Sequence, residues 1–294
     1  MSARPKISAY PDEVALRALG ALRFVDAATG ELITDGLSVI ARVRDKEIPA
    51  IASQRGVHIF HHLPGMNRIA AWDGESTLTP VPLQHEFNIE VRDASQRYFP
   101  AMFKSKFAAW PESPIICNGA GTLDNKISLY ATPWRLPRND FAIIRGTLRV
   151  LAGDKPAAWA LLRVYRKDDI LMTNTHVVEG VAGSDGQFLL MFPWPKTDTP
   201  VVNGPQGPHW TLRIKAWYDA PDARIPANEL PDGVQRLPAL CSVLKQKSAI
   251  LLEASNSNTA LAPQEIIPGQ PLFLKTASVP PVTPDKKILY LQTT

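Results

Sequence analysis

Residues able to do acid–base or metal chemistry are sparse in this sequence. His58, His61 and His62 form its one histidine cluster, and Asp73 and Glu75 are the nearest acids. A metal site needs several ligands held in a defined geometry, and the His58-x-x-His61 spacing does not suit ligands arranged along one strand. We therefore expect polar or stacking histidines at a strand end or in a loop, with no metal and no cofactor.

Sequence motifs of catalytic nucleophiles are also absent or weak. Ser184 lies within Gly183-Ser184-Asp185-Gly186, which is typical of a tight turn, and no Gly-x-Ser-x-Gly elbow occurs. His176 sits in a β-like run, where a half-buried structural histidine is the expected role. Asp168 and Asp169 indicate a turn between strands. No phosphate-binding glycine loop is present. The sequence therefore predicts no catalytic residues, and we expect that the protein is not an enzyme.

Two cysteines, Cys117 and Cys241, stand 124 positions apart. A bridge between them is possible but does not follow from the sequence, and reduced thiols suit a cytosolic origin. The formal charge of +4 comes without a long Lys/Arg block, so we expect no nucleic-acid partner.

The N-terminal residues contain no apolar signal core, and no stretch approaches the roughly 18 apolar residues of a membrane helix. We expect cytoplasmic synthesis without a signal peptide and no membrane insertion. A released or cell-associated particle could still carry the protein elsewhere.

The elements that must position these residues are strands. The 27 prolines against 17 glycines favour short strands and long connections. We predict an all-β protein with two antiparallel β-sandwich-like domains joined by a Pro/Gly-rich segment, and with an extended C-terminal arm. The expected boundaries are residues 1–138, 139–254 and 255–294.

In the first block, strands are expected at 22–26 and 37–43, followed by a hairpin from Phe87 to Phe107 that turns at residues 93–96. Residues 108–139 are rich in Pro, Gly and Asn and indicate a linker or a meandering loop. A short helix or apolar turn is expected at residues 238–245.

Alternation is clearer in the second block. Inward positions are predicted at the even-numbered residues of four strands, separated by turns at 153–156 and 183–186. These inward positions are Ile144, Gly146, Leu148, Val150, Ala158, Ala160, Leu162, Val164, Phe188, Leu190, Phe192, Leu212, Ile214, Ala216 and Tyr218.

The same alternation places Trp159, Tyr165 and Trp217 away from this inward set. An outward aromatic surface is a candidate interface or ligand-binding site. The alternative is that the excursion at residues 196–210 or the C-terminal arm covers these rings.

The C-terminal region is proline-rich from residue 263 to 284 and ends with the apolar run Ile288-Leu289-Tyr290-Leu291. Apolar residues at the end of a polar tail indicate an arm that packs either on its own domain or on a neighbour. These four residues complete the candidate interface.

Residues 143–193 resemble the carboxypeptidase-regulatory-like (transthyretin-like) β-sandwich family. The stretch 144–148 (IRGTL) is similar to that family's first strand, and 155–160 (KPAAWA) to its turn and second strand. Residues 180–188 (GVAGSDGQF) are similar to its G-x-T-D-x-x-G-x-F turn, with Ala182 and Gly183 replacing the Thr and Asp. The resemblance implies a fold, with Phe188 filling the sandwich core, and it implies no activity.

The order of the parts resembles proteins encoded beside phage-tail-like contractile injection systems. The parts are a leading β block, the hairpin with Val91-Arg92-Asp93, the join with Thr132-Pro133-Trp134-Arg135, the sandwich, and the ending with Pro268-Gly269-Gln270-Pro271-Leu272. This implies a non-enzymatic structural or adaptor role, as a cap, collar, baseplate or fibre adaptor. We then expect other protein subunits as partners, and an oligomer. The alternative is a carbohydrate- or ligand-binding module that uses exposed aromatics.

Overall fold

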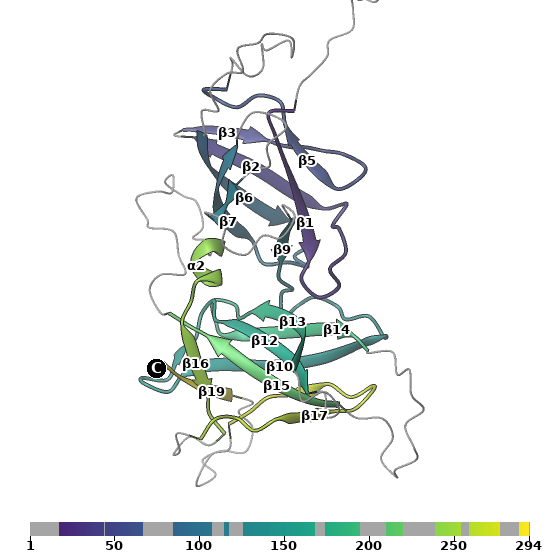
Figure 1. Ribbon diagram of the computed structural model, residues 1–294, viewed down its shortest axis with the longest axis vertical. Coiled ribbons are helices and arrows are strands. Elements are labelled where there is room, and N and C mark those ends of the chain that lie inside the picture. Colours follow the sequence, from purple (N-terminus) through teal and green to yellow (C-terminus); the bar gives the residue numbers. More distant parts are fainter. Residues whose placement is uncertain are drawn as a thin grey trace, which may run out of the picture.

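Strands supply nearly all of the regular structure, which confirms the all-β prediction (Figure 1). One short helix, α2 (Leu240–Leu244), interrupts them among the described residues, and it lies where the sequence predicts a helical turn. None of the helices in the described part of the chain is long and apolar enough to cross a membrane. The computed structural model describes residues 18–43, 45–66, 85–107, 115–117, 126–167, 174–194, 210–219, 239–253, 259–276 and 288–293.

The N-terminal block consists of two sheets around one apolar core. The first sheet has the order β4 (Ile51–Ala52), β5 (Val57–Phe60), β1 (Gly20–Asp26) and β9 (Lys126–Leu129). The second has the order β3 (Lys46–Pro49), β2 (Leu37–Val43), β6 (His85–Asp93), β7 (Ala101–Phe107) and β8 (Ile115–Ile116).

Aromatic side chains from both sheets fill this core. Phe107 of β7 packs against Phe60 of β5 and Phe87 of β6, with ring centroids 5.7 Å apart in both pairs. The predicted strands at 22–26 and 37–43 and the predicted Phe87–Phe107 hairpin are present. The hairpin pairs Ile89 with Phe103 and keeps both side chains inside the block.

The C-terminal block, called the sandwich below, is a strongly curved ten-stranded sheet (Figure 1). Its main path has the order β11 (Lys155–Pro156), β10 (Phe141–Val150), β19 (Ile288–Thr293), β16 (Ser248–Leu251), β15 (Trp210–Trp217), β12 (Leu161–Lys167) and β13 (Asn174–Val181). Three strands join at its sides: β14 (Gln187–Pro193) and β18 (Leu272–Phe273) pair with β10, and β17 (Gln264–Ile266) pairs with β15.

The predicted alternation orders the core of this block. Leu212, Ile214 and Ala216 of β15 lie inside it, opposite Phe188 and the other even-numbered residues of β14. Phe188 is 2% exposed, and its ring lies where a side chain on Gly146 would stand. A core of this kind follows because successive side chains on a strand point to opposite faces.

The end of the C-terminal region packs on its own domain, which is one of the two expected alternatives, but as an integral strand and not as an extended arm. Strand β19 runs parallel to β10 and antiparallel to β16, so it lies between two strands of the same sheet. Leu289 and Leu291 are fully buried in the sandwich core, with Leu251 beside them. Strands β17 and β18 also come from the region expected to be an arm. A strand placed in this way satisfies its backbone on both edges and its apolar side chains on the inner face, which a free arm cannot do.

Residues 157–160 also depart from the prediction, which extends the strand back to Ala158. The chain turns here instead, and β12 begins only at Leu161. Trp159 has a φ of 64°, in the left-handed region that side-chain-bearing residues rarely adopt. The turn breaks the period-2 pattern, so Ala160 lies in the sandwich core while Ala158 packs against the N-terminal block.

The join between the blocks contains regular secondary structure. The region expected as a linker or meander supplies the short strands β8 and β9, and Cys117 follows β8 directly. Cys117 forms a disulfide with Cys241 on α2, which settles the pairing that the sequence leaves open. The bridge connects the N-terminal block to the segment that follows β15.

Candidate interaction surface

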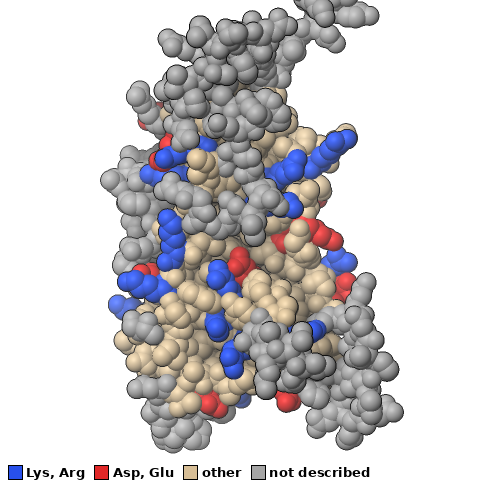
Figure 2. All heavy atoms as spheres, viewed as in Figure 1, with Lys and Arg blue, Asp and Glu red and all other residues tan. Residues whose placement is uncertain are grey.

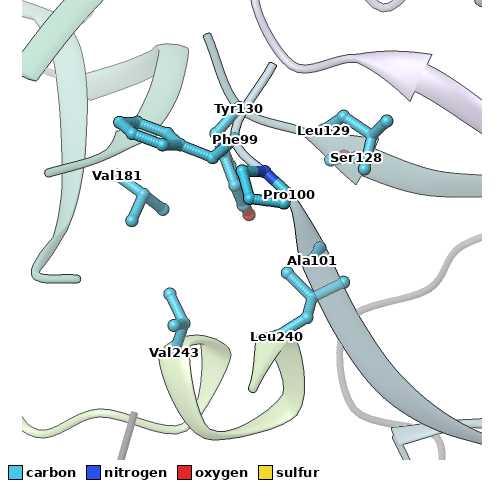
Figure 3. A pocket seen from close by; sticks show the side chains of 9 residues that line it. All are labelled: Phe99, Pro100, Ala101, Ser128, Leu129, Tyr130, Val181, Leu240 and Val243. Atoms are coloured by element: carbon cyan, nitrogen blue, oxygen red, sulfur yellow. The ribbon is translucent and has the colours of Figure 1, made fainter. Parts of the chain in front are cut away.

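The apolar core of the N-terminal block extends onto the sandwich, which has a second core of its own. The buried cluster that contains Phe103 and Phe107 of the N-terminal block continues through Trp159 and Val181 of the sandwich to Val243 of α2. Figure 3 shows Phe99, Tyr130 and Val181 converging with the helix side chains on a small space between the blocks. The cavity has a volume of about 20 Å³ and is mostly apolar, which is room for about one water molecule. This space is therefore a packing feature of the join and not a ligand pocket.

Trp159 belongs to this join. It faces away from the sandwich core, as predicted, but it is only 8% exposed because the N-terminal block covers it. Its ring meets Phe99 edge-on, with centroids 5.7 Å apart. Gln246 holds the turn by accepting a hydrogen bond from the Leu161 amide and donating one to the Trp159 carbonyl. Trp159 is therefore covered, which corrects its assignment as an interface residue, and the cover that the described residues show is the N-terminal block.

A polar contact crosses the same join, and a neighbouring contact within the sandwich supports it. The Tyr130 hydroxyl donates to Glu179 Oε1 at 2.8 Å, and Arg163 donates to Glu179 Oε2 at 3.1 Å. Burial raises the pKa of Tyr130 well above its usual value, and the Glu179 carboxylate raises it further. The hydroxyl therefore remains a donor over the whole working pH range.

Tyr165 and Trp217 lie on the surface that we name the outer face: the outward side chains of β12, β13 and β15. Both rings are partly exposed, as the alternation predicts. The Arg163 guanidinium lies 4.7 Å from the Trp217 ring centroid, and Lys215 Nζ lies 5.2 Å from that of Tyr165. Figure 2 shows Lys and Arg side chains gathered over this region of the sandwich. The outer face is thus basic as well as aromatic, and a cation already covers one face of each ring.

Alternation on β15 could have revealed the basic side chains. Arg213 and Lys215 share the outward phase of Trp217, and Arg163 shares that of Tyr165. The sequence prediction selected the aromatics alone.

His176 completes the outer face. It is exposed and meets Tyr165 edge-on at 5.6 Å, so the expectation of a half-buried histidine is wrong. The cause is an irregularity in the pairing of β12 with β13 at Val164/Tyr165, which sets Tyr165 opposite His176.

The four residues of the apolar run at the C-terminus have two different roles. Two are buried in the core, and Tyr290 holds β19 to a neighbouring turn. Leu289 and Leu291 are in the core and cannot contact a partner in the folded chain, which corrects their assignment as interface residues. Ile288 and Tyr290 are partly buried. The Tyr290 hydroxyl donates to Asp154 Oδ1 at 2.9 Å and so ties β19 to the turn after β10.

A second exposed apolar site escaped the sequence prediction. Trp134 and Leu136 are 65% and 88% exposed, on a segment that is firmly held. Between them, Arg135 points inward, pairs with Asp26 at 2.5 Å and lies 4.9 Å from the Tyr98 ring centroid. Burial, with a further contribution from Asp26, raises the pKa of Tyr98 to about 12. An ordered segment that presents a tryptophan to solvent is characteristic of an interaction anchor.

The same segment is fixed further at its start. The Thr132 hydroxyl donates to the Gln96 carbonyl at 2.6 Å, and the Thr132 amide donates to the Arg97 carbonyl at 3.0 Å. Arg97 in turn pairs with Asp93 and Asp35. The exposed side chains therefore sit on a preorganised support.

The residues considered for chemistry form no site in the described part of the chain. His58 is 3% exposed and lies edge-on to Phe24 at 5.4 Å, and its burial lowers its pKa. His61 and His62 follow outside the core, while Asp73, Glu75, Asp168 and Asp169 lie outside the described residues. Ser184 is exposed in the predicted turn. In the described part of the chain, no three His, Cys, Asp or Glu side chains are placed to hold a metal ion.

Charged side chains elsewhere serve the fold. Glu90 is 2% exposed on β6 and pairs with Arg42 and Arg92. Burial acts to raise the pKa of Glu90, but the hydrogen bonds from Arg92 and Arg42 outweigh it, and the pKa is lowered. Glu90 therefore forms a buried ion pair with Arg42 and Arg92, and its lowered pKa is not that of a general acid.

Comparison with known proteins gives little further guidance. No family model matches the chain, and no curated protein matches it. Among solved structures it is similar to the Bacillus anthracis TIE protein at 11% identity, covering 94% of this chain and 34% of that one, with a TM-score of 0.24. It is also similar to a streptococcal ancillary pilin at 10% identity, covering 70% and 55%, with a TM-score of 0.18. The chain thus spans about a third and about half of these proteins.

Proposed function

We propose that this chain is a non-enzymatic structural or adaptor component of a multi-protein assembly. The observation that carries the proposal is the continuous apolar core that joins the two blocks. The Cys117–Cys241 bridge and the Tyr130–Glu179 hydrogen bond add to it. A join of this kind holds the surfaces of both blocks at a fixed distance and angle, which is what an adaptor requires.

Two surfaces are available to partners in this proposal. One is the pair Trp134 and Leu136, held out by the Arg135–Asp26 ion pair. The other is the outer face with Tyr165 and Trp217. The assembly that we propose is a phage-tail-like contractile injection particle, in which the chain would serve as a cap, collar, baseplate or fibre adaptor. That choice rests on the order of the sequence parts and on the resemblance of residues 143–193 to carboxypeptidase-regulatory-like domains.

The decisive experiment is native mass spectrometry of the tagged chain purified from its own cells under gentle conditions. The proposal predicts a complex of fixed stoichiometry that contains identifiable partner subunits and stays intact during sedimentation. Trp134→Ala combined with Leu136→Ala should reduce the yield of that complex. The control is Ile51→Ala, which removes another exposed apolar side chain, 59% exposed, from the N-terminal block. A chain that remains a monomer and is absent from every sedimenting particle would refute the proposal.

A further inference from the structure

The pairing register places the outward side chains of the outer face in two rows. In the first row Glu179, Arg163 and Lys215 stand side by side across β13, β12 and β15. In the second row His176, Tyr165 and Arg213 do the same. The sandwich core begins directly beneath both rows.

The charges in these rows are not balanced. Arg163 is engaged by Glu179 at 3.1 Å and by the Trp217 ring. Arg213 and Lys215 are both exposed, and neither forms an ion pair with another residue that the structure describes. Two cations without an ion-pair partner among the described residues therefore stand two positions apart on one strand, with Trp217 two positions further along.

This spacing matches an extended polypeptide. Outward side chains of a strand recur about every 6.5–7 Å, and alternate side chains of a second extended chain have the same repeat. Carboxylates at alternate positions of such a chain can stand over Arg213 and Lys215 together. The next alternate position then reaches the partly exposed edge of Trp217, whose ring is otherwise contacted by Arg163 and by the buried cluster of the N-terminal block, and an apolar side chain can pack on that edge.

We infer that the outer face binds an extended acidic segment of a partner protein, with the pattern acid-x-acid-x-apolar. The inference rests on the proposed adaptor function and specifies the chemistry of one partner. Glu265 is exposed and is paired with Thr211, two positions before Arg213. Its negative charge ends the cationic stretch there, so the partner segment has room for two carboxylates.

Other ligand classes fit this face less well. A sugar ring stacks on a bare aromatic face, whereas Trp217 and Tyr165 each already have a cation over the ring. A nucleic acid presents a phosphate at every nucleotide and is bound by several cations in succession. Here Glu179 and Glu265 bracket the two available cations, which favours a short run of carboxylates.

The test uses the full chain and a fluorescein-labelled peptide containing Asp-Thr-Asp-Thr-Leu, followed by fluorescence anisotropy. Two control peptides carry Asn-Thr-Asn-Thr-Leu or Asp-Asp-Thr-Thr-Leu. The first removes the charge and the second removes the alternate spacing. The inference predicts that both bind more weakly than the parent peptide, and that salt weakens the parent peptide's binding.

The matched protein variants are Arg213→Gln with Lys215→Gln, and Lys126→Gln with Lys155→Gln. Each pair removes two exposed cations, the second pair from other strands. The first pair should weaken peptide binding about fivefold to thirtyfold, because each exposed charge pair contributes modestly, and the second should leave it unchanged. All four side chains are exposed, and circular dichroism melts check that the variants fold alike.

Three results would overturn the inference. They are equal binding of the uncharged peptide, equal binding of the peptide with adjacent acids, and tighter binding of oligo(dT) than of the acidic peptide. None of them would affect the native mass of the assembly, so a failure here is distinguishable from a failure of the adaptor function. A native complex that persists with the Arg213 and Lys215 variants would show that other surfaces hold it together.

Discussion

The Tyr130 hydroxyl donates a 2.8 Å hydrogen bond to Glu179 Oε1, and this bond joins the N-terminal block to strand β13 of the sandwich. Tyr130 is only 5% exposed, and the same carboxylate is engaged by Arg163. A charged acceptor inside a partly buried network makes the bond stronger than a neutral one. The join is therefore specified by polar geometry as well as by apolar packing.

Tyr130→Phe tests this bond. Removing the hydroxyl should lower the free energy of unfolding by about 1.5–3 kcal/mol, because Glu179 loses a buried donor. Urea denaturation followed by tryptophan fluorescence measures the change. Tyr165→Phe is the control, since that ring lies on the outer face, and it should have almost no effect. Equal stability of both variants would show that the bond contributes nothing.

The Cys117–Cys241 bridge gives a second prediction. It links positions 124 residues apart, so it removes much chain entropy from the unfolded state. Cys117→Ser combined with Cys241→Ser should destabilise the chain by about 3–5 kcal/mol in the loop-entropy description. Denaturation midpoints with and without a reductant provide the measurement. The reduced wild type and the double variant should coincide, and an unchanged midpoint on reduction would argue against the bridge.

His58 predicts a loss of stability in acid. Its burial lowers the pKa in the folded chain, so the unfolded chain binds the proton more readily. Its contribution to stability is complete above the unfolded pKa of about 6.5 and is lost as the pH falls below that value, by at most about 1.4 kcal/mol per pH unit. Unfolding free energies between pH 7.5 and 5 should show this slope.

In His58→Phe the slope below pH 6.5 should flatten, whatever the absolute stability of the variant. His176→Phe makes the same substitution at an exposed histidine and is the control. If the two variants have identical pH profiles, His58 is not the group responsible.

Strand β19 gives a prediction that distinguishes an integral strand from a loosely packed arm. Leu289 is fully buried between β10 and β16, so Leu289→Ala should cost about 2–5 kcal/mol. Thr293→Ala, at an exposed position on the same strand, should cost little. Thermal and urea unfolding measure both. If Leu289→Ala changes the free energy of unfolding only slightly, β19 is a loosely packed arm and not an integral strand.

Two glycines with nearly the same backbone conformation allow a controlled comparison. Gly30 and Gly186 have φ values of 72° and 81°. A Cβ on Gly30 would meet nothing within 4 Å, whereas on Gly186 it would lie 2.3 Å from the Leu148 carbonyl oxygen. Gly30→Ala should therefore cost only the left-handed penalty of about 1–2 kcal/mol, and Gly186→Ala clearly more. Equal costs in urea unfolding would show that the Leu148 backbone yields freely.

Much of the sandwich could be predicted because its signals are local. The alternation of Leu212, Ile214 and Ala216 assigns these residues to one face of a strand whatever that strand pairs with. The glycine at position 186 marks a turn for a reason confined to its own backbone. The same reasoning correctly placed Tyr165 and Trp217 on the outer side of the sandwich.

The candidate surface was predicted only in part. Trp159 faces outward as predicted, but Ala158 was misplaced because the strand pattern was continued through a turn in which Trp159 has a positive φ. Arg213 and Lys215 were passed over although they share the phase of Trp217. Trp134 and Leu136 lie in no periodic sequence pattern that could have revealed them. Their exposure goes with the ion pair between Arg135 and Asp26, which are distant in sequence.

By itself, the sequence determined the all-β class and the face on which most residues of the predicted sandwich strands lie, since both depend on neighbours one or two positions away. Only the tertiary structure decided that Trp159 would be covered and that β19 would lie between β10 and β16. It also decided that Cys117 would meet Cys241 and that Tyr130 would meet Glu179. These features depend on which distant segments pack together, and that choice is made by the free energy of the whole core rather than by any local pattern.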